Sequence, residues 1–299
     1  MISGIVNVYK EKGFTSHDVV AKLRGILHQK KIGHTGTLDP DAVGVLPVCL
    51  GRATKLCDML TDQTKTYETV LLLGQVTDTQ DISGMILEES KVTVNPQEVI
   101  EAILKYLGDY DQIPPMYSAL KVGGKKLYQL AREGIEVERK PRRVQILDIQ
   151  ILKMDLPRVT MSVTCSKGTY IRTLCHDIGA DLGCGGCMES LIRTQVGNFS
   201  IENSLTLKEI EEKVIKDTFL NDIMSIPDMF THLPKVVVKR KYHKLIYNGN
   251  PFYVEHCIDE TEHACQDGQV RVYDEDETFI GIFKRDDSLY VPVKMFLEP

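Results

Sequence analysis

The sequence has little that would place the protein in a membrane or outside the cell. No apolar run approaches the ~20 residues that a membrane-spanning helix needs. The N-terminus lacks the charged-then-apolar pattern of a signal peptide. Internal repeats and low-complexity segments are also absent. We therefore expect a globular protein of the cytoplasm that has no membrane partner.

The cysteines do not suggest a disulfide framework, because there are eight of them in 299 residues. Cys184 and Cys187 have the C-x2-C spacing of half a zinc site, and Cys175 and His176 lie upstream. A tetrahedral site needs a second well-spaced pair, and the helix expected around Cys175 gives poor ligand geometry. We therefore expect no metal, and unligated cysteines near a turn.

An overall excess of positive charge is lacking too, since the net charge is -6. Locally the picture differs, because residues 121–143 hold eight basic side chains against three acidic ones. Residues 235–244 hold five basic side chains and no acid. Clustered positive charge is what phosphate binding requires, but a solvated charged face explains the clusters equally well.

The expected elements indicate an α+β protein with a boundary near residues 230–235. Strands are predicted at residues 5–8, 67–73, 144–152 and 159–165, and residues 33–47 are predicted to be a loop. Helices are predicted to start at an N-cap Ser16, after Asn95 and at the capping box of Thr206 and Glu209. After Pro234, short β-rich runs alternate with turn residues, as in a small barrel. We expect domains at 1–232 and 233–299.

Asp39 lies in the most informative segment, residues 33–47 (GHTGTLDPDAVGVLP). The glycines allow the backbone to approach a ligand closely, and Pro40 disfavours helix at Asp39. Such a loop suits a carboxylate that is held in one geometry against a substrate. An Asx-type turn, in which Asp39 caps its own backbone, is the competing interpretation. The local residues alone favour the turn.

The whole segment resembles the catalytic signature of the TruB family of tRNA pseudouridine synthases. Further blocks occur in that family's order and at its approximate spacing, at residues 65–67 (KTY), 74–81 (GQVTDTQD), 114–121 (PPMYSALK) and 166–173 (SKGTYIRT). One departure is Tyr9-Lys10-Glu11, where the family usually has Asp-Lys-Pro. The resemblance covers residues 1 to about 200. It implies a catalytic domain with a mixed, mainly antiparallel sheet flanked by helices.

The resemblance also implies roles for individual residues. Asp39 matches the family's essential aspartate, Tyr67 the tyrosine that stacks on the target base, and Arg172 the arginine that pairs with the aspartate. His34 matches a histidine that occupies space around the extruded nucleotides. Leu191 and Lys10 match positions that line or neighbour the pocket.

These roles form a coherent chemistry. A stacked uridine must be flipped into a pocket before it can be isomerised, and an aromatic surface for the freed base is worth ~1–3 kcal/mol. An arginine fixes the direction of a carboxylate through charge-assisted hydrogen bonds. The carboxylate then acts as nucleophile or base while the C1′–N1 bond breaks and the base rejoins through C5. No step is redox, and no metal or organic cofactor is expected.

The two basic segments fit RNA binding. Residues 115–143 are expected to form an RNA-clasping insertion that is poorly ordered without RNA, with Lys121, Lys125 and Lys126 near phosphates. Residues 233–299 resemble a PUA domain, an RNA-binding barrel. Between Glu255 and Asp287, eleven acids stand against three bases, so any RNA contact of this domain is expected through residues 235–244.

Three functions compete. The first is isomerisation of the T-loop uridine at tRNA position 55, by a monomer that binds the T-arm and has no obligate protein partner. The second is a catalytically idle RNA-binding or RNA-folding protein, against which Asp39, Tyr67 and Arg172 argue. The third is a synthase of the same family with a guide-RNA-selected substrate. The compact chain, without charged terminal extensions, makes the third less favoured.

Overall fold

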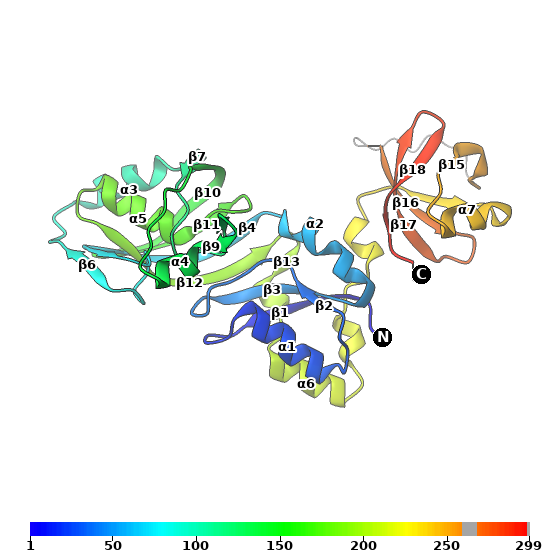
Figure 1. Cartoon of the computed structure of the whole chain (residues 1–299), viewed down its shortest axis with the longest axis horizontal. Helices are drawn as coiled ribbons and strands as arrows, with labels where there is room; N and C mark the ends of the chain where they lie inside the picture. Colours follow the sequence, from blue (N-terminus) through cyan, green and yellow to red (C-terminus); the bar gives the residue numbers. More distant parts are fainter. Residues whose placement is uncertain (259–267, 298–299) are drawn as a thin grey trace.

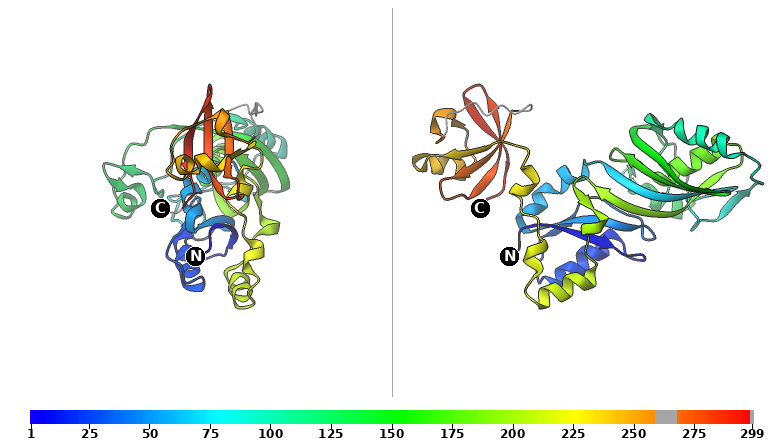
Figure 2. Two further views of the ribbon diagram at one scale, coloured as in Figure 1. Left: turned by 90° about the vertical axis from the view of Figure 1, so that its right-hand side faces the viewer. Right: turned by 180° about the vertical axis from the view of Figure 1, so that it is seen from behind.

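Two β-sheets with separate cores dominate the protein (Figure 1). The structure is a computed structural model that describes residues 1–258 and 268–297. The larger sheet occupies the left and centre of Figure 1, and the smaller one lies to its right, so that the molecule is elongated. Figure 2 shows the same arrangement from the side and from behind.

The larger sheet has nine strands in the order β1-β3-β12-β4-β11-β10-β7, with β2 paired to β3 and β13 paired to β12. All neighbours are antiparallel except β3 and β12. The expected mixed, mainly antiparallel α+β fold is therefore confirmed. The strands are β1 Gly4–Lys10, β2 Ile32–His34, β3 Val43–Leu50, β4 Lys65–Leu73, β7 Gly108–Gln112, β10 Arg142–Asp155, β11 Arg158–Cys165, β12 Gly186–Val196 and β13 Phe199–Ser200.

Helices cover this sheet at two places. The helices α1 and α6 lie beside β1 and β2, whereas α3 and α5 pack near β10, β12 and β4 (Figure 1). The helical segments are α1 Ser16–Ile26, α2 Cys57–Thr61, α3 Pro96–Leu104, α4 Leu127–Arg132, α5 Ile171–Asp181 and α6 Leu207–Ile215. The predicted caps at Asn95 and Thr206 are confirmed, since each forms a capping box with the acid three residues on.

Two local predictions were wrong, and one strand was missed. The N-cap of α1 is Thr15, which exchanges hydrogen bonds with Asp18, while Ser16 is buried. Residues 33–47 are not a loop throughout, because β2 and β3 include residues 33–34 and 43–47 and leave residues 35–42 as the loop. No strand was predicted where β12 runs, yet β12 lies in the middle of the sheet. Glycine and proline hid β3 from a pattern that looks for alternating apolar residues.

Two small hairpins project from the larger sheet. One pairs β5 Gln75–Thr77 with β6 Ile86–Glu89, and the other pairs β8 Lys121–Val122 with β9 Lys125–Lys126. The β8–β9 turn is made by Gly123 and Gly124, both with positive φ, as a two-residue type I′ turn requires. Together with α4, this hairpin stands out to one side in the left view of Figure 2.

The second sheet has five strands in the order β14-β16-β17-β18-β15 and curls around a core of its own. A further cluster joins Ile282 and Phe296 to Leu56, Leu60 and Phe230, so the sheet packs against α2. Arg52 and Lys55 also donate to the carbonyls of Phe296 and Met295. Its elements are β14 Lys235–Val238, α7 His243–Tyr247, β15 Phe252–Tyr253, β16 Gln269–Asp274, β17 Phe279–Asp286 and β18 Leu289–Met295.

Candidate active site

The loop of residues 35–42 presents Asp39 and is tied down on both sides. The Thr35 hydroxyl donates to the Pro47 carbonyl at 3.1 Å, and the Leu38 amide donates to Oγ of Ser16 at 3.0 Å. Leu38 is buried in the main core cluster. The Asp39 side chain itself is 43 % exposed. The loop therefore holds a reachable carboxylate on an anchored backbone.

Lys10 is hydrogen-bonded to this loop. Its ammonium donates to the carbonyls of Glu11, Phe14 and Pro40 at 3.2, 2.7 and 3.1 Å, and the residue is fully buried. Burial lowers the pKa of Lys10 to about 8, and the charge of Asp39 opposes that shift. Lys10 thus fixes the backbone directly after Asp39.

Arg172, near the start of α5, pairs with Asp39. Its Nε lies 3.1 Å from Oδ2 of Asp39, and its Nη2 lies 3.5 Å from Oδ1. The guanidinium is 6 % exposed and also donates to the carbonyls of Thr79 and Tyr117 at 3.0 and 2.8 Å. Oδ2 of Asp81 lies 3.7 Å from its Nη1. These contacts allow Arg172 to hold the Asp39 carboxylate in one direction.

Tyr67 and Leu191 lie on two neighbouring strands, β4 and β12. Tyr67 lies on β4 and is 9 % exposed, and Leu191 on the neighbouring β12 packs against the cluster that contains Tyr67 and Leu38. Burial raises the pKa of Tyr67, and Asp39 raises it further, whereas the guanidinium of Arg193 lowers it. The Tyr67 phenol is therefore neutral at ordinary pH and lies within electrostatic reach of Asp39.

His34 stands at the edge of the same region, at the end of β2. Its Nδ1 accepts a hydrogen bond from the Gly36 amide at 3.3 Å, which leaves the proton on Nε2. The ring meets His17 of α1 edge-on with centroids 5.1 Å apart. Burial lowers the pKa of His34, and the charges of His17 and Arg193 add to the effect. His34 thus offers a neutral ring beside the Asp39 loop.

Comparisons with known proteins bear on this geometry. Residues 24–171 match the family model for the TruB family pseudouridylate synthase (N terminal domain), and residues 172–229 match that for the tRNA pseudouridylate synthase B C-terminal domain. A protein of Lachnoclostridium phytofermentans named tRNA pseudouridine synthase B is 54% identical, over 99% of this chain and 100% of its own. The chain belongs to the TruB family. It is a pseudouridine synthase, an isomerase.

Two further likenesses agree with this assignment. A tRNA pseudouridine synthase B of Alkaliphilus oremlandii is 48% identical over 94% of this chain and 92% of its own. Among solved structures, a chain in the crystal structure of a Cbf5–Nop10–Gar1 complex superposes with a TM-score of 0.74 at 27% identity, over 98% of this chain and 85% of that one. The fold of this TruB protein is thus shared with a chain of that complex.

Two charged residues of this TruB site were missed from the sequence. Asp81 lies in a segment that supported the family resemblance, but nothing in the pattern indicated its proximity to Arg172. Arg193 lies two residues after Leu191 on β12 and is 1 % exposed. Alternation along a strand places residues i and i+2 on one face. This alternation could have placed Arg193 on the same face as Leu191 only if β12 had been predicted as a strand.

The RNA-clasping insertion predicted for this TruB chain is rooted at the active site. Tyr117 at its start accepts from Arg172, while the β8–β9 hairpin carries Lys121, Lys125 and Lys126. Lys125 pairs with Glu133 at 3.2 Å, and the Lys126 ammonium lies 5.5 Å from the centre of the Tyr128 ring. Lys121 has no acidic partner among residues 1–258 and 268–297. Contact of this insertion with RNA stays a prediction.

The basic run of residues 235–244 is partly neutralised by the turn that follows β16. Lys235 pairs with Glu277, and Arg240 pairs with Glu275 and Asp276 at 3.5 and 2.7 Å. Within the described ranges, Lys241 and Lys244 have no acidic partner, and Lys241 lies over the ring of Tyr242. If this part of the chain binds phosphate, we therefore expect Lys241 and Lys244 to make most of the contacts.

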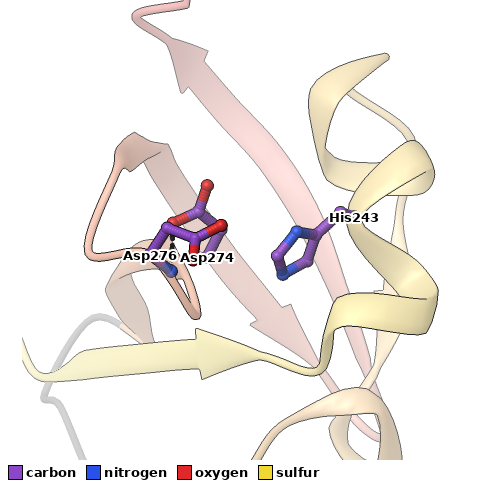
Figure 3. Close-up of side chains that lie close together, drawn as sticks. All are labelled: His243, Asp274 and Asp276. Carbon is purple, nitrogen blue, oxygen red and sulfur yellow. Dashed lines mark hydrogen bonds between the residues drawn. The ribbon is translucent and has the colours of Figure 1, made fainter.

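One group in the described part of the chain has metal-ligand chemistry, namely His243, Asp274 and Asp276 beside α7 (Figure 3). Oδ1 of Asp274 accepts from the Asp276 amide, and Oδ2 from the Tyr247 hydroxyl. Asp276 binds Arg240. Because protein donors already occupy both carboxylates, the group is explained as a turn. Among the same residues, Cys175, His176, Cys184 and Cys187 do not form such a group.

Proposed function

We propose that this protein isomerises the T-loop uridine at position 55 of tRNA, with Asp39 acting on a flipped-out nucleotide. The single observation that carries the proposal is the two-point contact of Arg172 with Asp39 beside Tyr67. The names of the relatives, which are tRNA pseudouridine synthases B, support tRNA as the substrate. We expect the reaction to take place in the cytoplasm; within the described ranges, no helix has the length and apolar character needed to span a bilayer.

The proposed chemistry is balanced within the nucleotide. The C1′–N1 bond breaks with its electron pair on the base, the base turns, and a C5–C1′ bond forms with loss of the C5 proton. A proton returns to N1, so the product is an isomer of the substrate. Asp39 supplies the nucleophile or base, Arg172 its orientation, and Tyr67 a surface for the flipped base.

The insertion of residues 115–143 and residues 233–299, a PUA-like unit in this proposal, would bind the RNA. Exposed lysines on the β8–β9 hairpin suit contact with T-arm phosphates. We expect a monomer that works without a protein partner or guide RNA. Sedimentation of the purified protein tests the first expectation, and the assay below tests the second because it contains only enzyme and tRNA.

The deciding experiment compares three proteins on unmodified tRNA transcripts, with pseudouridine located by chemical probing or mass spectrometry. Wild type should modify position 55, Asp39→Asn should leave it unmodified, and Asp41→Asn, a carboxylate in the same loop, should retain activity. Pseudouridine at another position only, or full activity of Asp39→Asn, would contradict the proposal. RNA binding without any pseudouridine from wild type would favour the idle RNA-binding alternative.

A further inference from the structure

Arg193 is a buried cation for which the site described above has no task. It lies on β12 with 1 % exposure, and its Nε donates to the Val45 carbonyl at 2.7 Å. In the described part of the chain, its buried Nη2 has no hydrogen-bond partner. A guanidinium carries five donors, and an interior guanidinium with an unused donor is costly. A side chain retained at such a cost suggests a task at the site.

The strand register places Arg193 against Tyr67. The two residues are directly paired between β12 and β4, and Gly44 of β3 is paired with Arg193 on the other side. Paired residues on neighbouring strands direct their side chains to the same face. A Cβ at Gly44 would lie 2.2 Å from the Arg193 carbonyl oxygen. Glycine is therefore required for β3 to come this close.

The loop that carries Asp39 also lies close to the Arg193 guanidinium. A Cβ built on Gly36 would lie 3.8 Å from Nη1 of Arg193. The charge of Arg193 contributes, after burial, to the lowered pKa of Lys10, about 8, and of Lys65, about 8. Arg193 thus lies next to the Asp39 loop and near two other buried cations. Its strand partner is Tyr67, whose pKa its charge lowers.

We propose that Arg193 is a positioning residue for Tyr67, whose hydroxyl oxygen accepts a hydrogen bond from Nη2 when the ring takes its place against the target base. A guanidinium only donates, so the phenol oxygen must accept and its own proton must point away from Arg193, into the pocket. The ring is then fixed in tilt and the hydroxyl in direction. This inference rests on the proposed function, since it assumes that Tyr67 contacts the base.

A double-mutant cycle tests the proposal. Wild type, Arg193→Lys, Tyr67→Phe and the double variant are compared in single-turnover rate at saturating tRNA, and in the Kd for tRNA. Each single change should slow the rate at least tenfold with Kd within threefold, because ring position and not RNA binding is lost. The double variant should be no slower than the slower single one. Rate losses that multiply, or losses confined to Kd, would overturn the inference.

A second measurement covers the case in which Arg193→Lys does not fold. Exchange of the Arg193 guanidinium protons is followed by NMR in wild type and in Tyr67→Phe, each with and without T-arm RNA. RNA should slow this exchange in wild type and not in Tyr67→Phe, and equal slowing in both would overturn the inference. Inactive wild type would instead contradict the proposed function. The two failures are therefore distinguishable.

Discussion

Arg172 determines the geometry of the site because one buried side chain contacts three separate segments. It meets the catalytic loop at Asp39, the turn after β5 at Thr79 and the start of the insertion at Tyr117. The guanidinium is planar and its donors have fixed directions. The three segments must therefore adopt one arrangement for all of these bonds to form. A buried charge that loses such partners is strongly destabilising.

Replacing Arg172 by lysine should separate charge from geometry. Lysine keeps the charge but has three donors on a flexible stem and no fork. We expect the single-turnover rate to fall at least ~100-fold, on the order of 3 kcal/mol of transition-state stabilisation, with little change in tRNA affinity.

The matched control is Arg158→Lys, which alters an arginine that is 53 % exposed and pairs with Glu189 at 2.8 Å. Exposed ion pairs contribute little, so its rate should stay within about twofold of wild type. Equal losses in the two variants would indicate a general effect of arginine removal and contradict the role given to Arg172.

Among individual residues, the sequence alone could predict only those site residues that fit a known family pattern. Asp39, Tyr67 and Arg172 were predicted through the family resemblance, because the local chemistry of Asp39 favoured a simple turn. The contact of Arg172 with Asp39 agrees with that prediction. Arg193 and Asp81 were missed since an arginine in a strand or an aspartate in a turn is ordinarily exposed. Only the fold shows that Arg193 is buried.

Among the elements, β3 shows why the pattern of apolar residues in the sequence did not predict a strand there. Gly44 has φ of +106° and meets β12 too closely for a side chain, and the Pro47 carbonyl accepts from the Thr35 amide. Glycine and proline are rare inside strands because they weaken or interrupt pairing. Here the glycine is explained by a neighbour that is distant in sequence, Arg193. The helix starts at Asn95 and Thr206 were predictable because a capping box involves only four consecutive residues.

Lys65, the first residue of β4, closes the carbonyl end of α2 by donating to Thr61 and Gln63 at 2.6 and 2.7 Å. Burial lowers its pKa from 10.5 to about 8. Between these pH values the unfolded chain binds a proton that the native protein lacks, so stability rises with pH. Relative to Lys65→Met, the free energy of unfolding of wild type should rise by up to about 1.4 kcal/mol per pH unit across this interval.

Urea unfolding of both proteins from pH 7 to pH 10.5 measures this gain as a difference, which cancels the titration of buried tyrosines and cysteines. Lys153→Met is the control, because Lys153 is 74% exposed and lies 3.9 Å from Asp155. Its difference from wild type should show no comparable rise. A flat difference for Lys65→Met would mean that the buried ammonium does not titrate in this range.

For the whole molecule, the positions of the charged residues matter more for RNA binding than the net charge. A net charge of -6 coexists with a lysine-bearing hairpin whose root touches the catalytic arginine. In the second sheet, acids of the turn after β16 already bind Lys235 and Arg240. The two basic segments looked alike in sequence. In the first segment Lys125 and Arg143 are paired as well, with Glu133 and with Asp109 and Asp111, so in both segments ion pairs reduce the positive charge that faces solvent.

Removing the charge of the hairpin tests its role. In Lys121→Ala/Lys125→Ala/Lys126→Ala, tRNA affinity should fall, and the slope of log K against log salt should decrease by about one for each lost phosphate contact. Binding titrations at several salt concentrations measure both. Lys208→Ala, on the exposed side of α6, is the control. An unchanged slope in the triple variant would remove the hairpin from the RNA interface.

The bond between Arg172 and the Tyr117 carbonyl links the insertion to the catalytic carboxylate through a single group. Thermodynamic linkage is reciprocal: if placing the insertion favours one orientation of Asp39, then that orientation favours the same placement to an equal extent. An RNA that orders the insertion would then assemble the carboxylate as well. A uridine in an RNA too short to reach the hairpin would meet an active site whose parts are all present but less often aligned.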